Sequence, residues 1–105
     1  MKGYAGKILK INLNKNIEEI GLSKEMARKY MGGVGFGAKL LYEELEPQTD
    51  PLSPKNVFIV TSGPISGVNF TGAGRSVFVS KSPLTNGWMH STMGGSFAAE
   101  MKRAG

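Results

Sequence analysis

Glycine accounts for 15 of the 105 residues of this chain, which is about twice its average share in proteins. Glycine adopts positive φ and permits close backbone approach, although it loses more conformational entropy on folding than any other residue. Its abundance therefore predicts sharp turns, or backbone segments that lie directly against a neighbour or a ligand. Three clusters carry this signal: residues 32–37, Gly72 with Gly74, and Gly94-Gly95.

Length and composition limit the class of protein. A chain of 105 residues forms one domain at most, and its 20% charged and 40% hydrophobic residues are typical of a globular protein rather than a disordered one. The absence of cysteine excludes a disulfide framework, a thiolate zinc site, a cysteine nucleophile and an iron–sulfur cluster held by cysteines of this chain. The single His90 cannot form a histidine metal site alone, and we expect it to be structural.

Charge and hydropathy limit the cellular location of the chain and its classes of partner. No segment approaches the roughly 20 apolar residues of a membrane span, and the N-terminus lacks the apolar core of a signal peptide. We therefore expect a cytoplasmic protein with no membrane partner. The formal net charge of +5 admits a basic nucleic-acid-binding domain as an alternative function. No run of like charge reaches five residues, so we favour an ordinary solvated surface.

Hydrophobic periodicity predicts two strands, two helices, three strands and a last helix, in that order. The expected strands cover residues 8–13, 17–20, 57–60, 77–79 and 88–92, and the expected helices cover residues 24–31, 36–46 and 96–103. Strands that come in runs, rather than alternating with helices, favour an α+β fold over a doubly wound sheet. We expect a β-sheet platform with helices packed on one face.

Local signals add detail to three of these elements. Alternation in the first strand places Leu9, Ile11 and Leu13 on one side, which predicts a half-buried strand. Ser23 is a good N-cap for the first helix. Lys102 of the last helix is expected to stay in water. The residues of that helix that are expected to pack are Phe97, Ala98, Met101 and Ala104.

The first glycine cluster, G-G-V-G-F-G at 32–37, resembles a phosphate-binding loop only superficially. The dinucleotide fingerprint places glycines at G-x-G-x-x-G after a strand, whereas here the third glycine falls one residue early and a helix precedes the cluster. We favour a helix-to-helix turn in which small residues let two helices pack closely. The acidic Glu43, Glu44 and Glu46 of the next helix disfavour a DNA-binding helix-turn-helix and offer no acid/base pair.

The other two glycine clusters are candidate anion sites. Arg75 follows Gly72 and Gly74 at the start of a strand, and a guanidinium pairs well with phosphate or carboxylate. A plain surface arginine is the alternative. Gly94-Gly95 precedes the last helix, whose first N–H groups can bind an anion, unless Ser96 simply caps that helix. Together these clusters suggest a phosphate-bearing ligand on a sheet, and they identify no catalytic residue.

Several motifs carry a family resemblance that runs nearly from end to end. They are G-K-I-L-K-I-N-L at 6–13, M-G-G-V-G at 31–35, D-P-L-S-P-K-N at 50–56, S-G-P-I-S-G at 62–67, T-G-A-G-R at 71–75, K-S-P-L-T at 81–85, G-G at 94–95 and F-A-A-E-M-K-R-A-G at 97–105. The D-P-L-S-P, T-G-x-G-R and K-S-P-L-T stretches in this order are specific. On these motifs the chain resembles the N-terminal part of the tungsten-containing aldehyde:ferredoxin oxidoreductases.

The resemblance implies a cofactor and the residues that approach it. In this family a pair of similar β-sheets forms a base for tungstopterin, which is tungsten or molybdenum held by two pyranopterins with magnesium between their phosphates. Arg75 would lie at the pterin, between it and the iron–sulfur cluster. Gly94 and Gly95 would approach the pterin through backbone atoms. Thr92, where family members often have asparagine, would offer its backbone carbonyl to the magnesium ion.

The resemblance also implies a reaction that this chain cannot perform alone. The family oxidises aldehydes to carboxylates and passes electrons through a [4Fe–4S] cluster to ferredoxin, although some relatives reduce other acyl substrates. Family enzymes are several times longer, and their cluster cysteines lie downstream. We therefore expect residues 1–105 to be an N-terminal fragment with half of the two-sheet base, whose partners are the remainder of the enzyme and, through it, ferredoxin.

Two further expectations concern the chain by itself. A stand-alone anion- or pterin-binding module is the alternative to the fragment, and a homodimer could then imitate the missing second sheet. A half-base would also expose a sheet edge and an apolar face, so we predict self-association or limited stability. The sequence identifies neither the substrate nor which of tungsten and molybdenum the enzyme uses.

Overall fold

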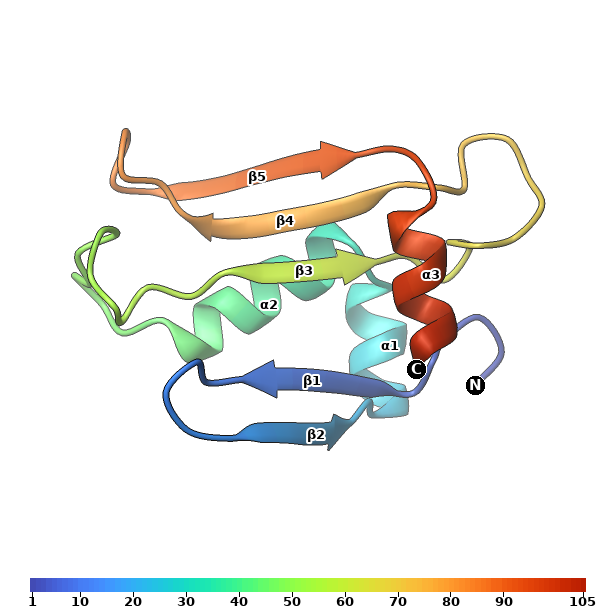
Figure 1. Cartoon of the computed structure of the whole chain (residues 1–105), viewed down its shortest axis with the longest axis horizontal. Helices are drawn as coiled ribbons and strands as arrows, with labels where there is room; N and C mark the ends of the chain where they lie inside the picture. The colour runs from blue at the N-terminus through green and yellow to red at the C-terminus, as the bar shows by residue number, and fades with distance from the viewer.

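The computed structural model describes all 105 residues, which form five strands and three helices (Figure 1). In chain order the elements are β1 (Lys7–Ile11), β2 (Ile17–Gly21), α1 (Lys24–Tyr30), α2 (Val34–Glu44), β3 (Ile59–Ser62), β4 (Ser76–Lys81), β5 (Trp88–Met93) and α3 (Phe97–Ala104). The α+β class and the order of elements are confirmed. The predicted strand at 57–60 is misplaced, because residues 59–62 are the ones that pair with β4.

The strands form two separate antiparallel sheets. β1 and β2 make a hairpin in which Ile11 pairs with Ile17 across the turn. β3, β4 and β5 make a three-stranded sheet with β4 in the centre. Ser76 at the start of β4 pairs with Met93 at the end of β5. The loop that enters β4 and the loop that leaves β5 are therefore neighbours at one end of the sheet.

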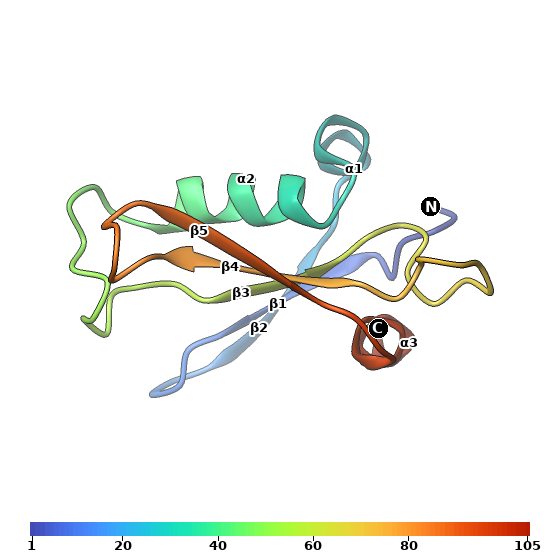
Figure 2. The same ribbon diagram turned by 90° about the horizontal axis from the view of Figure 1, so that it is seen from above.

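Helix α2 covers one face of the three-stranded sheet (Figure 2). Its Leu41 packs with Ile59, Val77 and Val79 in the main buried cluster. These strand residues share a face because Ile59 pairs with Val79 and side chains alternate along each strand. Gly37 of α2 is also buried, so the helix backbone lies directly on the sheet.

The first glycine cluster is the turn between α1 and α2, as the sequence predicts. A Cβ on Gly35 would collide with the carbonyl oxygen of Tyr30 in the last turn of α1. Gly32 has a φ of 142°, and a Cβ there would stand 3.1 Å from the Ser62 carbonyl oxygen of β3. Helix α2 begins at Val34, earlier than predicted, and it packs closely on the sheet as well as on α1. The cluster therefore serves packing rather than a ligand.

Helix α1 is capped at both ends. The Ser23 hydroxyl oxygen accepts a hydrogen bond from the Met26 N–H at 3.1 Å, which confirms the predicted N-cap. At the other end the Tyr4 hydroxyl lies 2.8 Å from the Met31 carbonyl oxygen and 3.3 Å from that of Ala27. The Ala27 carbonyl also accepts the Met31 N–H at 3.1 Å, whereas the Met31 carbonyl lies past the helix end and has no intrahelical donor. Tyr4 therefore satisfies the Met31 carbonyl and ties the N-terminal segment to the end of α1.

The burial predicted for the first strand is wrong. Leu9 and Ile11 are 56% and 55% exposed, and Leu13 lies beyond the strand and is 95% exposed. Ile8, on the opposite face, is the half-buried residue of β1. Alternation separates the two faces of a strand correctly, but it cannot show which face another element covers. In this chain nothing covers the face that carries Leu9 and Ile11.

Helix α3 lies on the side of the sheet opposite α1 and α2 (Figure 2), so the expectation of helices on one face holds for the first two. Ala98 of α3 is fully buried, and the Phe97 ring stacks on Phe78 of β4 with centroids 6.5 Å apart. The expected exposure of Lys102 is wrong, because this side chain is half-buried against the loop after β3. No helix of the chain has the length and apolar character that crossing a membrane requires.

Candidate functional site

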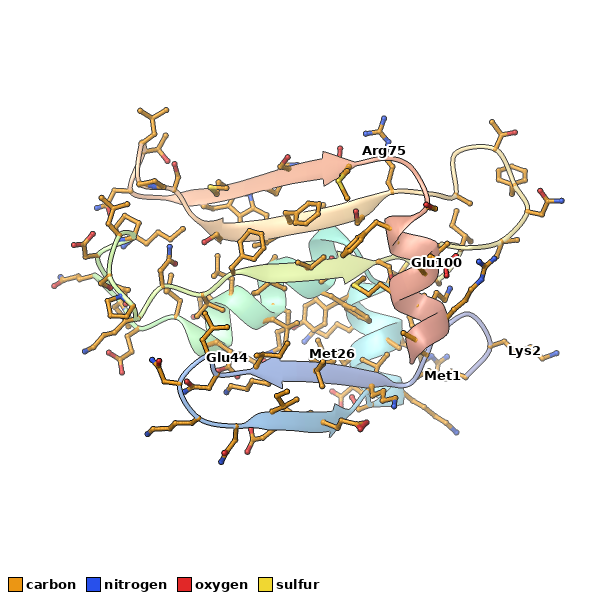
Figure 3. All side chains as sticks on the ribbon, in the orientation of Figure 1. Met1, Lys2, Met26, Glu44, Arg75 and Glu100 are labelled. Carbon is orange, nitrogen blue, oxygen red and sulfur yellow. The ribbon has the colours of Figure 1, made fainter.

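The start of β4 and the end of β5 bring two of the predicted site residues together. Arg75 immediately precedes β4, and Thr92 of β5 pairs with Val77. Residues two apart on a strand share a face, so Arg75 can reach the neighbouring strand at Thr92. Its Nη1 donates a hydrogen bond to the Thr92 Oγ1 at 2.8 Å. Figure 3 shows the Arg75 side chain at the outer edge of the sheet, beside the end of β5.

The Arg75 guanidinium keeps most of its binding capacity. It has five N–H donors, of which the bond to Thr92 uses one. The ion pairs of the chain all involve other residues, so no carboxylate neutralises this charge. The side chain is exposed. Arg75 is therefore oriented by Thr92 and still free to bind an anion.

The loops that carry Arg75 and Gly94-Gly95 lie directly against each other. A Cβ on Gly74 would stand 2.9 Å from the carbonyl oxygen of Gly95, which is closer than real Cβ contacts. Gly95 itself has a φ of 99°, which a residue with a side chain rarely adopts. Glycine at both positions thus lets the two loops meet. The two anion sites that the sequence predicts separately become one surface.

Gly94 has a different reason to be glycine. A Cβ on Gly94 would meet no atom of this chain within 4 Å, and its φ is not positive. Neither packing within the chain nor backbone conformation therefore requires glycine at this position. A Cβ at this position would occupy open space above the backbone.

The N–H groups before α3 are free. Ser96 makes no side-chain capping hydrogen bond, so the simple N-cap that the sequence left open as an alternative is not formed. The backbone N–H groups of Gly94, Gly95 and Ser96 donate to no acceptor in the chain, and all three residues are exposed. Such groups at a helix N-terminus attract anions. We call Arg75, Thr92 and residues 94–96 together the anion surface.

The anion surface offers no side-chain metal site. Nowhere in the chain do three His, Cys, Asp or Glu side chains gather closely enough to hold a metal ion. A metal at this surface would therefore take oxygens from the backbone or from a bound ligand. β5 is an edge strand, so part of its backbone faces away from the sheet and has no strand partner. The metal role of the Thr92 carbonyl stays a prediction.

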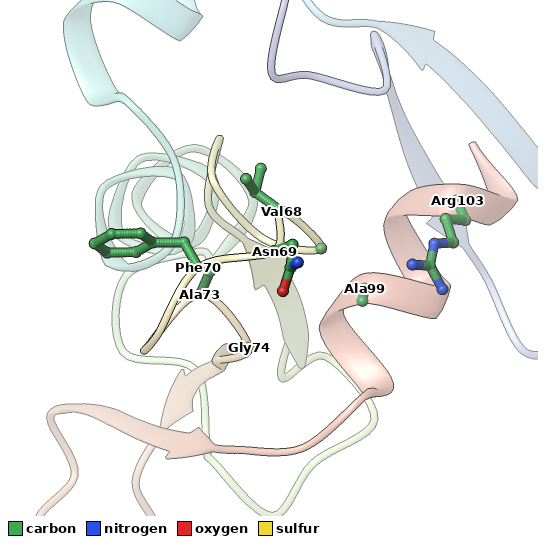
Figure 4. A pocket seen from close by; sticks show the side chains of 8 residues that line it. Val68, Asn69, Phe70, Ala73, Gly74, Ala99 and Arg103 are labelled. Carbon is green, nitrogen blue, oxygen red and sulfur yellow. The ribbon is translucent and has the colours of Figure 1, made fainter.

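A shallow hollow of about 430 Å³ adjoins the anion surface, between the loop at 67–74 and α3 (Figure 4). Ala73 and Gly74 lie on one side of it, and Ala99 and Arg103 lie on the other. Arg103 is already paired with Glu100 of its own helix. The hollow therefore adds shape, but no second unpaired cation, to the surface.

The sequence does not single out Lys102, although the structure places it against the loop that leads from β3 toward Arg75. Its Nζ donates to three backbone carbonyls of the loop after β3. The position of Lys102 in the helix could have predicted its burial. It follows the fully buried Ala98 by four residues and so shares that face of α3. A lysine on a buried helix face must find acceptors for its ammonium.

The fold and the anion surface define an α+β sheet domain that presents an arginine and exposed backbone N–H groups at one end of the sheet. The family model that matches residues 8–105 is described as the aldehyde ferredoxin oxidoreductase, N-terminal domain. The chain belongs to this family, which confirms the resemblance found in the sequence.

Individual relatives agree with this assignment. The chain is 42% identical over 106 residues to the tungsten-containing aldehyde ferredoxin oxidoreductase of Pyrococcus horikoshii, covering all of the chain and 18% of that protein. It is 35% identical over 109 residues to the aliphatic sulfonate oxidoreductase, WOR-like subunit, of Pyrococcus furiosus, covering all of the chain and 17% of the relative. The chain thus spans less than a fifth of these proteins.

A solved structure shows the same fold. The active site complex BamBC of benzoyl coenzyme A reductase, in complex with 1,5-dienoyl-CoA, superposes on 99% of this chain with a TM-score of 0.94 and 33% sequence identity. The match covers 16% of that chain. The similarity therefore concerns one N-terminal region within a much longer protein.

Proposed function

We propose that the chain is the N-terminal, cofactor-cradling part of a tungsten- or molybdenum-dependent oxidoreductase, and that its anion surface binds the phosphate-bearing pyranopterin. The observation that carries the proposal is the contact between the two glycine loops, which unites Arg75 with the free N–H groups of residues 94–96. The family relationship supports the same conclusion, because relatives along the whole chain are named as tungsten-containing enzymes.

The residues at the surface fit such a group. A phosphate needs several N–H donors and a positive charge, and this surface offers both. Glu100 in the first turn of α3 is paired with Arg103. Without a Cβ, the backbone at Gly94 is open to close approach by such a ligand. Arg75 would bind the phosphate or the pterin edge, and Gly94 and Gly95 would approach it through the backbone. Thr92 would orient Arg75 through Oγ1 and offer its carbonyl oxygen to magnesium.

The chemistry would come from the bound group, and position would come from the protein. When bound, the metal and its pterins supply two-electron redox chemistry. The proposed reaction converts an aldehyde and water to a carboxylate, with release of two electrons and three protons. The chain contains no cysteine, so a [4Fe–4S] cluster that passes these electrons to ferredoxin would take its ligands from elsewhere in the protein.

The substrate is set outside this chain. Matching relatives carry different substrates in their names, namely aldehydes, an aliphatic sulfonate and, over 48 residues at 44% identity, glyceraldehyde-3-phosphate. A common N-terminal region with different substrates agrees with a role in holding the cofactor. No residue of the anion surface is therefore assigned to substrate recognition.

The first test is cofactor content. The chain would be purified from a host that makes the pyranopterin and is supplied with tungstate, and tungsten, molybdenum and pterin would be quantified. We expect about one pterin for each chain, lost in Arg75→Ala and kept in Arg28→Ala, an exposed arginine on α1. Pterin that is retained in Arg75→Ala would contradict the assignment of Arg75.

The second test measures the anion surface directly. Pyrophosphate would be titrated into the 15N-labelled chain while the amide signals of residues 94–96 are followed. We expect these signals to shift, and Arg75→Ala to weaken binding roughly ten- to a hundredfold because charge-assisted hydrogen bonds are lost. Signals that do not respond, or that respond equally in Arg75→Ala, would overturn the proposed anion site.

A further inference from the structure

Lys102 reaches from α3 to the loop that follows β3. Its Nζ lies 2.6 Å from the carbonyl oxygen of Pro64, 3.1 Å from that of Ser66 and 3.4 Å from that of Gly63. An ammonium has three N–H donors and no acceptor, so three carbonyls match its whole capacity. One side chain thus holds together segments that lie more than thirty residues apart in the chain.

The loop is shaped to present these carbonyls. Ser66 is 5% exposed, and its Oγ accepts the Gly63 N–H at 3.0 Å while its own N–H donates to the Gly63 carbonyl at 3.1 Å. This turn directs carbonyl oxygens toward one point. Burial lowers the pKa of Lys102, so the ammonium is costly at this place without acceptors. The carbonyls and the ammonium therefore stabilise each other.

The loop in turn leads to both halves of the anion surface. The Gly67 N–H donates to the Ala73 carbonyl at 3.2 Å, which ties the turn to the segment that carries Arg75. A Cβ on Gly67 would stand 3.4 Å from the Cα and Cβ of Ala99, so the loop also packs on α3. Helix α3 follows directly after residues 94–96. Both parts of the surface are thus attached to the element that Lys102 clamps.

We propose that Lys102 is the positioning residue of the anion surface: its contacts with the carbonyls of residues 63–66 fix α3 against the loop at 63–75, and so fix Gly94-Gly95 against Arg75. The identity of the ligand rests on the proposed function, whereas the positioning concerns this chain alone. Lys102 touches neither ligand nor metal in this role. It acts through the two loops that meet at Gly74 and Gly95.

A second lysine in the chain provides a matched control. Lys81 is also half-buried, and its Nζ donates to the Thr49 carbonyl at 2.7 Å. It lies at the other end of β4, away from the anion surface. A general loss of stability should follow from replacement of either lysine. A local loss of order at residues 63–75 and 94–97 should follow only from replacement of Lys102.

The experiment compares Lys102→Met, Lys102→Arg and Lys81→Met in the 105-residue chain, at a temperature where melting curves show each variant folded. Hydrogen exchange is measured along the chain, and pyrophosphate affinity by titration. We expect Lys102→Met to speed exchange at the Gly67 and Glu100 amides roughly tenfold more than at β4 amides, and to weaken pyrophosphate binding about fivefold or more. Lys102→Arg should behave like the wild type in both measurements. Lys81→Met should raise exchange evenly along the chain, without an excess at Gly67 and Glu100, and should leave pyrophosphate affinity unchanged.

Different results would contradict the role of Lys102 and the proposed function. Exchange that rises uniformly along the chain in Lys102→Met, as in Lys81→Met, would overturn the positioning role. If the wild-type chain binds no pyrophosphate, the proposed function fails, while the exchange pattern still decides the role of Lys102. If Lys102→Met does not fold, the 15Nζ signal of wild-type Lys102 decides instead. A slowly exchanging ammonium is expected, and an ammonium that exchanges like those of exposed lysines would overturn the proposal.

Discussion

Gly37 of α2 lies so close to Val79 of β4 that a Cβ at position 37 would stand 2.5 Å from the Val79 Cγ2. Both residues are buried, and Val79 has no exposed surface. The contact sets the distance between the helix and the sheet that carries the anion surface. A methyl group at this point would push α2 away from β4.

The first prediction follows from this contact. Gly37→Ala should lower the free energy of unfolding, because overpacking of a core costs about 1–3 kcal/mol and the gain in helix propensity returns about 1 kcal/mol at most. Thermal and urea melting of the chain would measure the difference. Gly21→Ala is the matched control, since its Cβ would meet nothing within 4 Å and its φ is not positive. Equal stability of the two variants would contradict the close contact.

The glycine cluster also shows what the sequence can and cannot predict about the fold. The prediction that small residues at 32–37 let two helices pack closely is confirmed at Gly35, where a Cβ would collide with the Tyr30 carbonyl oxygen. The main partner of Gly37 is Val79, some forty residues later, and no local pattern links the two. The same limit explains Leu9 and Ile11, whose alternation is correct and whose burial is not.

The second prediction concerns pH and the ion pair between Lys10 of β1 and Glu44 of α2. The Lys10 Nζ lies 2.5 Å from the Glu44 Oε2. The hydrogen bond to Glu44, and then its negative charge, raise the pKa of Lys10 above its usual 10.5. Since the pKa is higher in the folded chain, the stabilisation is fully present below pH 10.5 and is lost as the pH rises through the raised value.

Melting temperatures of the wild-type chain and of Lys10→Met would be compared from pH 8 to pH 12. The wild type should melt at most a few degrees higher at pH 8, because exposed ion pairs are weak, and the difference should vanish at the alkaline end. Lys15→Met, which removes a lysine without an ion pair from the same hairpin, should show no such trend. A difference that persists at pH 12 would point to packing of the side chain rather than to charge.

The third prediction concerns Tyr4 and the end of α1. Tyr4→Phe removes the hydroxyl that donates to the Met31 and Ala27 carbonyls and keeps the ring near Phe36, at a centroid distance of 6.2 Å. We expect a loss of about 1 kcal/mol in the free energy of unfolding, as for one ordinary hydrogen bond, and faster exchange at the Met31 amide. Unchanged exchange at Met31 would show that the hydroxyl does not cap the helix.

The fourth prediction is self-association. The Phe58 side chain is 66% exposed and its ring lies 5.9 Å from that of Phe78, which in turn stacks on Phe97. Sedimentation velocity should therefore show an average mass that rises with concentration, and Phe58→Ser should reduce this rise. Leu84→Ser, in an exposed loop at 92% exposure, is the control. A monomer that melts cooperatively at every concentration would contradict the prediction.

The anion surface was only partly visible in the sequence. Arg75 and Gly94-Gly95 stand out because a glycine-rich loop before a strand or a helix leaves backbone N–H groups free. The role of Thr92 comes from the family resemblance alone, since the hydroxyl that accepts from Arg75 depends on the β4–β5 register. Lys102 was missed because its acceptors are backbone carbonyls more than thirty residues away, and carbonyls leave no mark in a sequence.

The last prediction separates the two roles of Thr92. Thr92→Val removes the hydroxyl that orients Arg75 and keeps the backbone carbonyl, and valine suits an exposed strand position. Pyrophosphate affinity should fall roughly two- to tenfold, as expected for one lost hydrogen bond, while stability changes by about 0.5 kcal/mol or less. Thr92→Ser, which keeps the hydroxyl, should bind like the wild type.

If the carbonyl is the magnesium ligand, added magnesium should strengthen pyrophosphate binding by the same factor in all three proteins. A magnesium effect that disappears in Thr92→Val would assign the metal to the hydroxyl instead.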